Sequence, residues 1–527
     1  MRAPAADPLP TVSALRWWEA RWFAALLLVA ATIPLWSVPL PPLTDLPGHI
    51  GRFHIAHAIT TSRLIARHWA YHWMPVGNLG ADIAVQALAT WLPIERAAWL
   101  VVAAIPPLWI GGLLLVSRES GGHPSPFAAL ALPLAYGFPF QNGFVNFMLS
   151  AGLAFYALAL WIALGRRGRI ALRAMLFVPL AALVWLAHGS GWALLVTAAF
   201  GADVARARGR DSTWPAALLR AGIGVAPMLP LPLIAILPAH GEHAAMRWDW
   251  IAKVGWPVML LRERWIVWDV AGALLLLAAI GIALSRRGWR IDSIGGAAAL
   301  ATLAAYVIQP KMAMGGNFVD LRMLAPGIAL ALVSIRPPAA LATRCAAAAL
   351  AFATVRLATS GVALFVAAIP QQQALAAVPH LPRGAAVLVL VGKTCEASWA
   401  GRRLDHIADL AIARREIFDN SEWMLAGQQL LDHRHARAGR FSADPSQLVF
   451  PPDCPYQATR MSDAIATFDR GTFGYVWTID LPARARLAPD VRLIWSNAIS
   501  ALYVVGQPTR GDRRPHLLRQ ASRDVAD

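Results

Sequence analysis

Long apolar segments follow one another through the first 370 residues, and they constrain the fold more than any other feature of the sequence. Crossing about 30 Å of hydrocarbon takes a helix of about 20 apolar residues, although shorter helices are tolerated inside a bundle. Eleven candidate segments lie at residues 22–40, 97–116, 126–140, 144–164, 172–187, 190–204, 216–237, 265–284, 293–309, 321–335 and 341–369. They predict an α-helical polytopic membrane protein, and a further apolar helix at 79–92 is too short to span.

Composition supports this interpretation and excludes a soluble multidomain protein. Of the 527 residues, 57% are apolar and 15% are charged, whereas soluble proteins carry about 25% charged residues. The net charge of +17 resides mostly in residues 1–370, with 28 basic and 14 acidic side chains, against 19 and 16 in residues 371–527. No basic soluble module interleaved with aromatic residues is present, so nucleic acid is excluded as a partner.

Arginine placement predicts the orientation in the membrane. With the N-terminus in the cytoplasm, the cytoplasmic loops contain Arg-rich clusters, while the shortest turns on the opposite side contain no basic residue. These clusters include Arg16 and Arg21, Arg166 to Arg173, Arg206 to Arg210, and Arg286 to Arg290. We therefore expect a multi-pass plasma (inner) membrane protein whose transmembrane domain covers residues 1–370 and whose first outer loop covers 41–78.

Residues 371–527 differ in character and predict a small α/β domain. Strand-like segments cover 385–392, 471–482 and 492–506, and a helical pattern covers 406–418. An odd number of spans places this domain on the periplasmic, extracytoplasmic side, where Cys395 and Cys454 meet an oxidising compartment. The two thiols either pair or stay free, and the last fifteen or so residues are predicted to be disordered.

The first outer loop carries the strongest candidate for chemistry. Asp45 directly follows the first span, and helical spacing places Asp45, His49 and Arg52 near one face. A carboxylate held at the membrane surface beside a cation is suited to act as a general base. Alternatively, Asp45 caps the N-terminus of the helix that it precedes.

Metal binding is a weaker hypothesis. His54 and His57 are three residues apart, a spacing that allows two ligands on one helix. His240 and His243, with Glu242 between them, form a similar group. No certain cofactor is predicted, and a divalent metal stays open.

Further polar side chains are predicted at the outer ends of later spans. Asn142 and Asn146 can bind a sugar hydroxyl or phosphate oxygen, or else bond neighbouring helices. His188 lies at a tight outer turn, where it faces the proposed site or simply packs. Arg322 can hold a phosphate in a bidentate fork, or form a structural pair with Asp320. No nucleotide-binding motif accompanies these residues.

Three features together resemble the integral-membrane glycosyltransferases of the C superfamily (GT-C), which include protein O-mannosyltransferases and the aminoarabinose transferase of lipid A. They are the stretch PPLTDLPGHIGRFHIAHA after the first span, the Arg-flanked body and the external C-terminal domain. GFVNFMLSAGLAF and FVDLRMLAP also resemble a poorly characterised bacterial branch. Many relatives have adjacent acidic residues in the first loop, whereas here Asp45 is followed by Leu46.

The resemblance implies transfer of a sugar from a polyprenyl-phosphate carrier to a glycan, lipid or protein acceptor on the outer face of the membrane. By analogy Asp45 is the base that deprotonates the acceptor, and His49 or His188 orients the reactants. Arg52, Asn142, Asn146, Asp320 and Arg322 are the candidate donor-binding residues. The alternatives are a lipid or sugar transporter (flippase), and a non-catalytic subunit of an envelope-polysaccharide assembly system.

Overall fold

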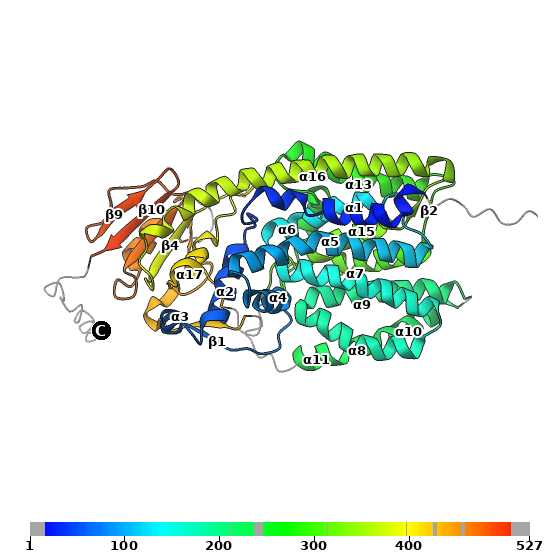
Figure 1. Ribbon diagram of the computed structural model, residues 1–527, viewed down its shortest axis with the longest axis horizontal. Coiled ribbons are helices and arrows are strands. Elements are labelled where there is room, and N and C mark those ends of the chain that lie inside the picture. The colour runs from blue at the N-terminus through cyan, green and yellow to red at the C-terminus, as the bar shows by residue number, and fades with distance from the viewer. Residues whose placement is uncertain are drawn as a thin grey trace, which may run out of the picture.

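The protein is described by a computed structural model, which places residues 16–210, 212–236, 246–313, 315–396, 398–424, 429–454 and 459–506. His240, Glu242, His243 and the predicted disordered tail lie outside these residues. The helices form a bundle along the long axis of the molecule, and a β-sheet lies at one end of it (Figure 1).

The bundle reproduces the order of the predicted apolar segments. Its helices are α1 (Arg21–Ala30), α4 (Gly80–Ala89), α5 (Ile94–Gly121), α6 (Phe138–Asn142), α7 (Val145–Arg166), α8 (Ile170–Ala187), α9 (Gly189–Arg208), α10 (Trp214–Val225), α11 (Pro230–Ile236), α12 (Trp250–Gly255), α13 (Ile266–Ser285), α14 (Ser293–Ile308), α15 (Leu321–Val333) and α16 (Ala339–Leu375). Among the described residues, five helices are long and apolar enough to cross a membrane: α5, α7, α8, α13 and the helix that begins at Ala339. The chain is therefore a multi-pass membrane protein, while the count of eleven spans stays a prediction.

Three predicted spans are not continuous α-helices, and each contains prolines. The segment expected at 22–40 forms α1 followed by the 3-10 helix η2 (Ile33–Ser37), which contains Pro34. The segment expected at 126–140 forms the 3-10 helix η3 (Ala128–Tyr136), which contains Pro133, followed by α6. The segment expected at 216–237 is divided into α10, the 3-10 turn η4 (Ala226–Met228) and α11. Proline lacks the N–H that an α-helix needs, so the chain breaks at these positions.

The C-terminal sheet has six strands in the order β6-β4-β7-β10-β9-β8. The strands are β4 (Val387–Gly392), β6 (Leu448–Val449), β7 (Tyr475–Ile479), β8 (Arg486–Ala488), β9 (Val491–Ser496) and β10 (Ser500–Val505). β4 pairs in parallel with β6 and β7, and the remaining pairs are antiparallel. Helices α17 (Leu410–Arg415) and α18 (Met461–Thr467) complete a mixed α/β region, as the sequence predicted.

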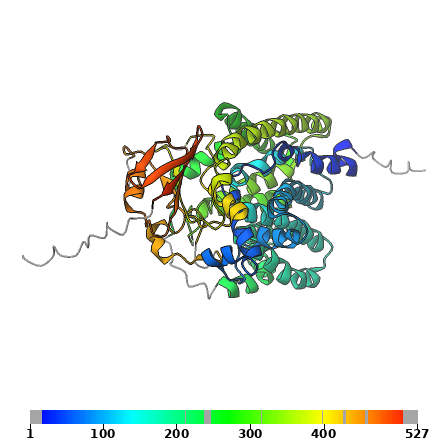
Figure 2. The same ribbon diagram turned by 60° about the vertical axis from the view of Figure 1, so that its left-hand side comes forward.

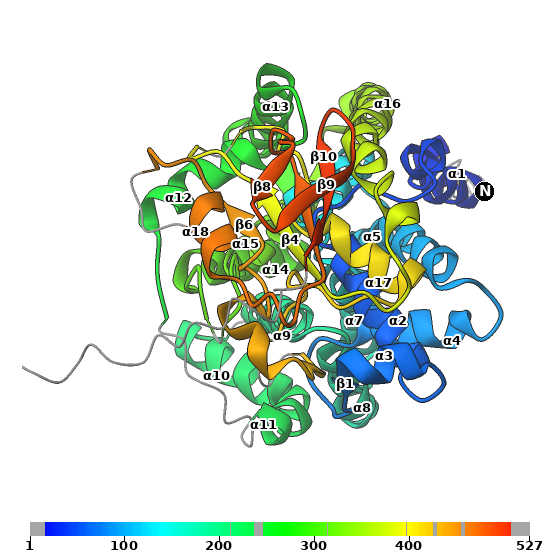
Figure 3. The ribbon, with the colours of Figure 1, turned by 90° about the vertical axis from the view of Figure 1, so that its left-hand side faces the viewer.

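The first outer loop lies between the bundle and the sheet. It forms α2 (Leu46–Ala58), α3 (Arg63–His68) and the strand β1 (Trp69–Tyr71), and α2 lies beside α17 (Figures 1 and 3). β1 pairs with β5 (Leu431–His433) of the C-terminal region. Next to this pair, the ring nitrogens of His68 and His435 lie 2.7 Å apart. The first outer loop and the C-terminal region therefore share hydrogen bonds.

The Arg-rich ends of the helices lie opposite the sheet. The short strands β2 (Arg290–Ile291) and β3 (Ile335–Arg336) pair at the far end of the bundle (Figure 1). Figure 2, turned by 60°, shows the same separation of the sheet from that end. Asp45 precedes α2 at the sheet end, so it is separated from these arginines along the bundle.

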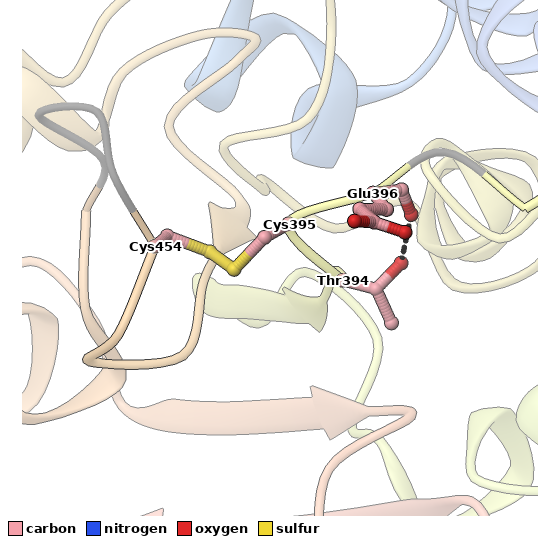
Figure 4. Close-up of a disulfide and its surroundings, with 4 residues drawn as sticks. All are labelled: Thr394, Cys395, Glu396 and Cys454. Carbon is pink, nitrogen blue, oxygen red and sulfur yellow. Dashed lines mark hydrogen bonds between the residues drawn. A yellow bond between two sulfur atoms is a disulfide. The ribbon is translucent and has the colours of Figure 1, made fainter.

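Cys395 and Cys454 form a disulfide, which settles the alternative that the sequence left open (Figure 4). The bond closes a segment of 59 residues within the C-terminal region. In the adjacent turn the Thr394 hydroxyl donates to the carbonyl oxygen of Glu396 at 2.6 Å.

Candidate active site

Asp45 lies at the N-terminus of α2, and its backbone is fixed from both sides. Its N–H donates to the carbonyl oxygen of Asn142 at 2.9 Å, and its own carbonyl accepts from the N–H of His49 at 3.0 Å. The side chain makes no capping hydrogen bond to α2, so the expectation that Asp45 caps the helix through its carboxylate is wrong. The carboxylate is left available for another role.

The surroundings of Asp45 raise the pKa of its carboxylate toward neutrality. Burial raises the pKa of this half-buried group to about 7, against the opposing effect of the His406 cation. The carboxylates of Asp405 and Asp444 raise this pKa further, and Arg322 lowers it. A general base works best when its pKa lies near the operating pH.

The turn before α7 approaches Asp45 through a glycine. Gly143 has a φ of +88°, and a Cβ there would lie 2.9 Å from the backbone nitrogen of Asp45. Its carbonyl oxygen lies 3.2 Å from Nε2 of His49, while Nδ1 of His49 is buried without a hydrogen-bond partner in the described structure. The structure thus brings together three predicted site residues, Asp45, His49 and Asn142.

Arg322 stands apart from Asp320, as their spacing on α15 indicates. Nη1 of Arg322 donates to the Ser190 hydroxyl at 3.3 Å, and the guanidinium lies 5.1 Å from the ring centre of Phe144. Nε of Arg322 is buried with no partner among the described residues. Asp320 instead pairs with Lys253, with Nζ 2.7 Å from Oδ2. Of the two alternatives for Arg322, the structural pair with Asp320 is therefore wrong.

His188 has a structural role at the turn between α8 and α9. Its Nδ1 accepts from the N–H of Ser190 at 3.0 Å, which caps α9. The ring packs edge-on against Phe147, at 5.8 Å between ring centres. The hydroxyl of Ser190 also accepts the hydrogen bond from Arg322. By capping α9, His188 therefore fixes the position of a residue that Arg322 contacts.

Arg52 and Asn146 meet at a buried carboxylate that the sequence analysis did not single out. Arg52 donates to Asp82 through Nε at 2.9 Å and Nη2 at 3.0 Å, and Nη1 donates to Gln429 at 2.7 Å. Asn146 donates to the same Asp82 at 3.0 Å, and its oxygen accepts the N–H of Ala81. This network joins α2, α4 and α7. It corrects the prediction that Arg52 and Asn146 bind the donor, because their polar groups are engaged in packing helices. The sequence did offer one sign of this network, because Asp82 is an acidic residue inside the apolar segment 80–89.

His54 and His57 do not form a metal site with their neighbours. Nδ1 of His57 lies 3.2 Å from Oε1 of Gln86, and both histidines line a surface cavity of about 600 Å³ beside Glu95 and Arg96. Within the described residues, no group of three or more His, Cys, Asp or Glu side chains is arranged to hold a metal ion.

The C-terminal region contributes charged groups that sequence reasoning missed. His406, Asp405 and Asp444 all influence Asp45, although they follow it by more than 350 residues. They lie on loops between short elements. Asp405 and Asp444 fall outside the predicted elements, and His406 begins the segment 406–418, whose helical pattern does not mark it as a site residue. Arg403 also reaches the first outer loop, where its Nη1 donates to the carbonyl oxygen of Pro42 at 3.0 Å.

Comparison with known proteins gives likenesses of fold. No family model and no curated protein matches the sequence. The structure is similar to the arabinofuranosyltransferase AftD from Mycobacteria, with 16% identity and a TM-score of 0.46, over 93% of this chain and 40% of AftD. It is also similar to ArnT from Cupriavidus metallidurans bound to undecaprenyl phosphate, with 13% identity and a TM-score of 0.48, over 92% of this chain and 98% of ArnT. Likenesses at this level concern the fold alone, so function has to be inferred from the side chains of the site.

Proposed function

We propose that the protein is a membrane glycosyltransferase that moves a sugar from a polyprenyl-phosphate carrier to an acceptor hydroxyl. In this reaction the acceptor oxygen bonds to the anomeric carbon, and the bond between that carbon and the phosphate oxygen breaks. The acceptor proton passes to the carboxylate of Asp45, and the electron pair leaves with the polyprenyl phosphate.

The observation that carries the proposal is the state of Asp45. Its carboxylate makes no capping bond, is half-buried at the end of the bundle and has a pKa of about 7. A group that serves only to stabilise a surface helix needs none of these properties. Proton transfer to a positioned base contributes about 10²- to 10⁴-fold to a rate.

Arg322 supports an anionic donor. It lowers the pKa of Asp45, which places its charge near that carboxylate, and its Nε has no partner in the described structure. A guanidinium binds phosphate oxygens in a bidentate fork, and stabilising the charge on the leaving phosphate is a large catalytic contribution. Asn142 and His49, both beside Asp45, are the proposed ligands of sugar or acceptor hydroxyls. Asp320, directly before α15, takes an indirect part, because it pairs with Lys253 of α12.

The lipid part of the donor suits the outside of the bundle. Helix α16 exposes Val355, Val362 and Phe365, as a helix in contact with lipid does. A polyprenyl tail can therefore remain among membrane lipids while the phosphate and sugar enter the polar site. The disulfide and the distance of Asp45 from the Arg-rich end favour the extracytoplasmic side for this site, with the N-terminus in the cytoplasm.

The test compares a deletion strain complemented with the wild type, Asp45→Asn or Asp432→Asn. Asp432 is exposed on β5, so its replacement is the same chemical change outside the site. Lipid extracts and surface glycans are measured by mass spectrometry, with membrane levels of each variant by immunoblot. We expect a polyprenyl-phosphate sugar to accumulate, and one glycan to lose a residue, in the deletion and in Asp45→Asn but not in Asp432→Asn.

The alternative functions give different results in this experiment. Full restoration by Asp45→Asn, at normal protein level, would overturn the proposed role of Asp45 and favour a transporter or a non-catalytic assembly subunit. A transporter deletion would leave the lipid-linked sugar on the inner leaflet, which a membrane-impermeant glycan label distinguishes.

A further inference from the structure

A loop of the C-terminal region packs directly on the first turn of α2. A Cβ at Gly48 would lie 2.6 Å from the Trp423 ring and 2.9 Å from Oδ2 of Asp409. Only a glycine at this position allows so close an approach, because any other side chain would displace the loop. Figure 3 shows α17, which follows Asp409, beside α2. The two elements thus meet one turn away from Asp45.

The imidazole of His406 is held at this contact on its edge and its face. Its Nδ1 donates to the carbonyl oxygen of Ser421 at 2.9 Å and lies 3.3 Å from Oδ2 of Asp409. Its Nε2 lies 3.7 Å from Oδ1 of Asp444, and its ring centre lies 4.0 Å from that of Trp423. A doubly protonated ring has an N–H on both nitrogens and carries a positive charge between the two carboxylates, so this arrangement fits an imidazolium.

The electrostatic surroundings agree with this arrangement. Burial alone lowers the pKa of His406, but the hydrogen bond and charge of Asp409, followed by Asp444 and Asp45, raise it to about 10. The cation also faces His49 on α2 and Glu422 on its own side, whose pKa values it lowers. A pKa of about 10 makes His406 a cation near neutral pH.

The charged groups around Asp45 oppose one another. His406 and Arg322 favour its ionised form, whereas Asp405 and Asp444 favour its protonated form. Each of these two acids has a cationic partner. Asp405 pairs with Lys393 at 2.8 Å, and Asp444 lies near His406 itself. Among the charges that the structure describes, His406 has the largest influence on Asp45.

We propose that His406 is a positioning residue that keeps Asp45 ionised for catalysis, so that the C-terminal region completes the active site rather than only covering it. The inference rests on the proposed function, because a general base has to be ionised in order to accept the proton of the acceptor hydroxyl.

The test measures the ionisation of Asp45 directly and needs no substrate. Dicyclohexylcarbodiimide is an apolar reagent that modifies protonated carboxyl groups, and peptide mass spectrometry reports its attachment to Asp45 in the purified full-length protein. In the wild type we expect labelling to fall as pH rises, with a midpoint near 7. In His406→Gln the midpoint should rise by about one pH unit, the lower end of the effect of a neighbouring opposite charge.

Two further variants make the result specific. His380→Gln is the same change at an exposed histidine that stacks on Trp495, away from α2, and should leave the midpoint unchanged. Asp444→Asn removes a like charge while its oxygen can still accept from Gln447, so the midpoint should fall. Opposite shifts in His406→Gln and Asp444→Asn are not expected from a general loosening of the structure. If His406→Gln does not fold, His406→Asn makes the same change of charge with a smaller side chain, and its midpoint should rise in the same way.

The outcomes separate this inference from the proposed function. An unchanged midpoint in folded His406→Gln overturns the role of His406 even if glycan transfer depends on Asp45, and an upward shift in Asp444→Asn overturns the like-charge effect of Asp444 on Asp45. Conversely, the predicted shifts together with full glycan restoration by Asp45→Asn leave the coupling intact and overturn the transferase. When both hold, His406→Gln should lose transfer at acidic and neutral pH and regain it in alkaline medium.

Discussion

Removal of the Asp82 carboxylate should destabilise the helical bundle strongly. Asp82 is fully buried and accepts hydrogen bonds from Nε and Nη2 of Arg52 and from Asn146, at 2.9 to 3.0 Å. In Asp82→Asn the guanidinium of Arg52 stays buried, at 2% exposure, without a compensating charge. Breaking a buried ion pair by removing one partner costs about 3–5 kcal/mol. We expect a loss near 3 kcal/mol, because asparagine retains one acceptor oxygen.

A double-mutant cycle separates charge from packing. Arg52→Met keeps an apolar stem of similar length and removes the cation. If the charges are coupled, Arg52→Met/Asp82→Asn should be about 2 kcal/mol more stable than the sum of the single effects predicts. The assay is reversible unfolding in mixed detergent micelles, followed by tryptophan fluorescence.

An exposed ion pair provides the control. Arg414 donates to Glu95 at 2.8 Å, with side chains 37% and 31% exposed. Glu95→Gln should therefore cost less than about 1 kcal/mol, as exposed pairs do. The reasoning is refuted if Asp82→Asn is also within 1 kcal/mol of the wild type, or if the two single effects simply add.

Three more predictions concern separate features. Gly143→Ala should lower the free energy of unfolding by about 1–2 kcal/mol because φ is +88°. It should also slow transfer, because its Cβ would push the turn against the candidate base. The control is Gly168→Ala, also at positive φ but with no atom within 4 Å of its Cβ, which should leave transfer unchanged in the same melting and glycan assays. Burial and the neighbouring histidines lower the pKa of His435 to about 4. The unfolded chain therefore binds a proton at His435 more readily than the folded one, and stability should fall as the pH drops from about 6.5 to 4. The melting temperature, measured against pH, should show this fall in the wild type and a smaller one in His435→Gln. The Cys395–Cys454 disulfide closes a segment of 59 residues. Its reduction should destabilise the C-terminal region by about 4 kcal/mol. An unchanged thermal transition after reduction, with free thiols confirmed by mass spectrometry, would contradict this value.

Sequence reasoning located the helices better than it located the side-chain partners. Hydropathy is a local property, and a membrane requires an uninterrupted apolar helix, so α7 and α13 follow directly from their composition. Prolines lie at the breaks at Pro133 and within 216–237, but α5 continues through Pro106 and Pro107, so proline alone does not predict where a helix ends. Asp45 stood out for the same local reason, as an acid directly after a span.

Tertiary structure alone decided which polar residues act together. Helical spacing put Arg52 near Asp45, yet the guanidinium bonds Asp82, thirty residues away. Likewise Asp320 takes Lys253 as its partner and leaves Arg322 toward Ser190. A buried charge takes whichever opposite charge packing brings within reach, and that choice is not encoded in local spacing.

The sequence by itself therefore determined a polytopic helical protein with a mixed α/β region at its C-terminus and an exceptional acid after the first span. Only the folded chain placed His406 over the first turn of α2, where it influences a carboxylate 361 residues earlier in the sequence. Apolar periodicity is set by residues a few positions apart, whereas the ionisation of Asp45 depends on burial and on charges supplied by distant loops. That is the physical reason why the membrane body could be predicted from the sequence and the surroundings of the candidate base could not.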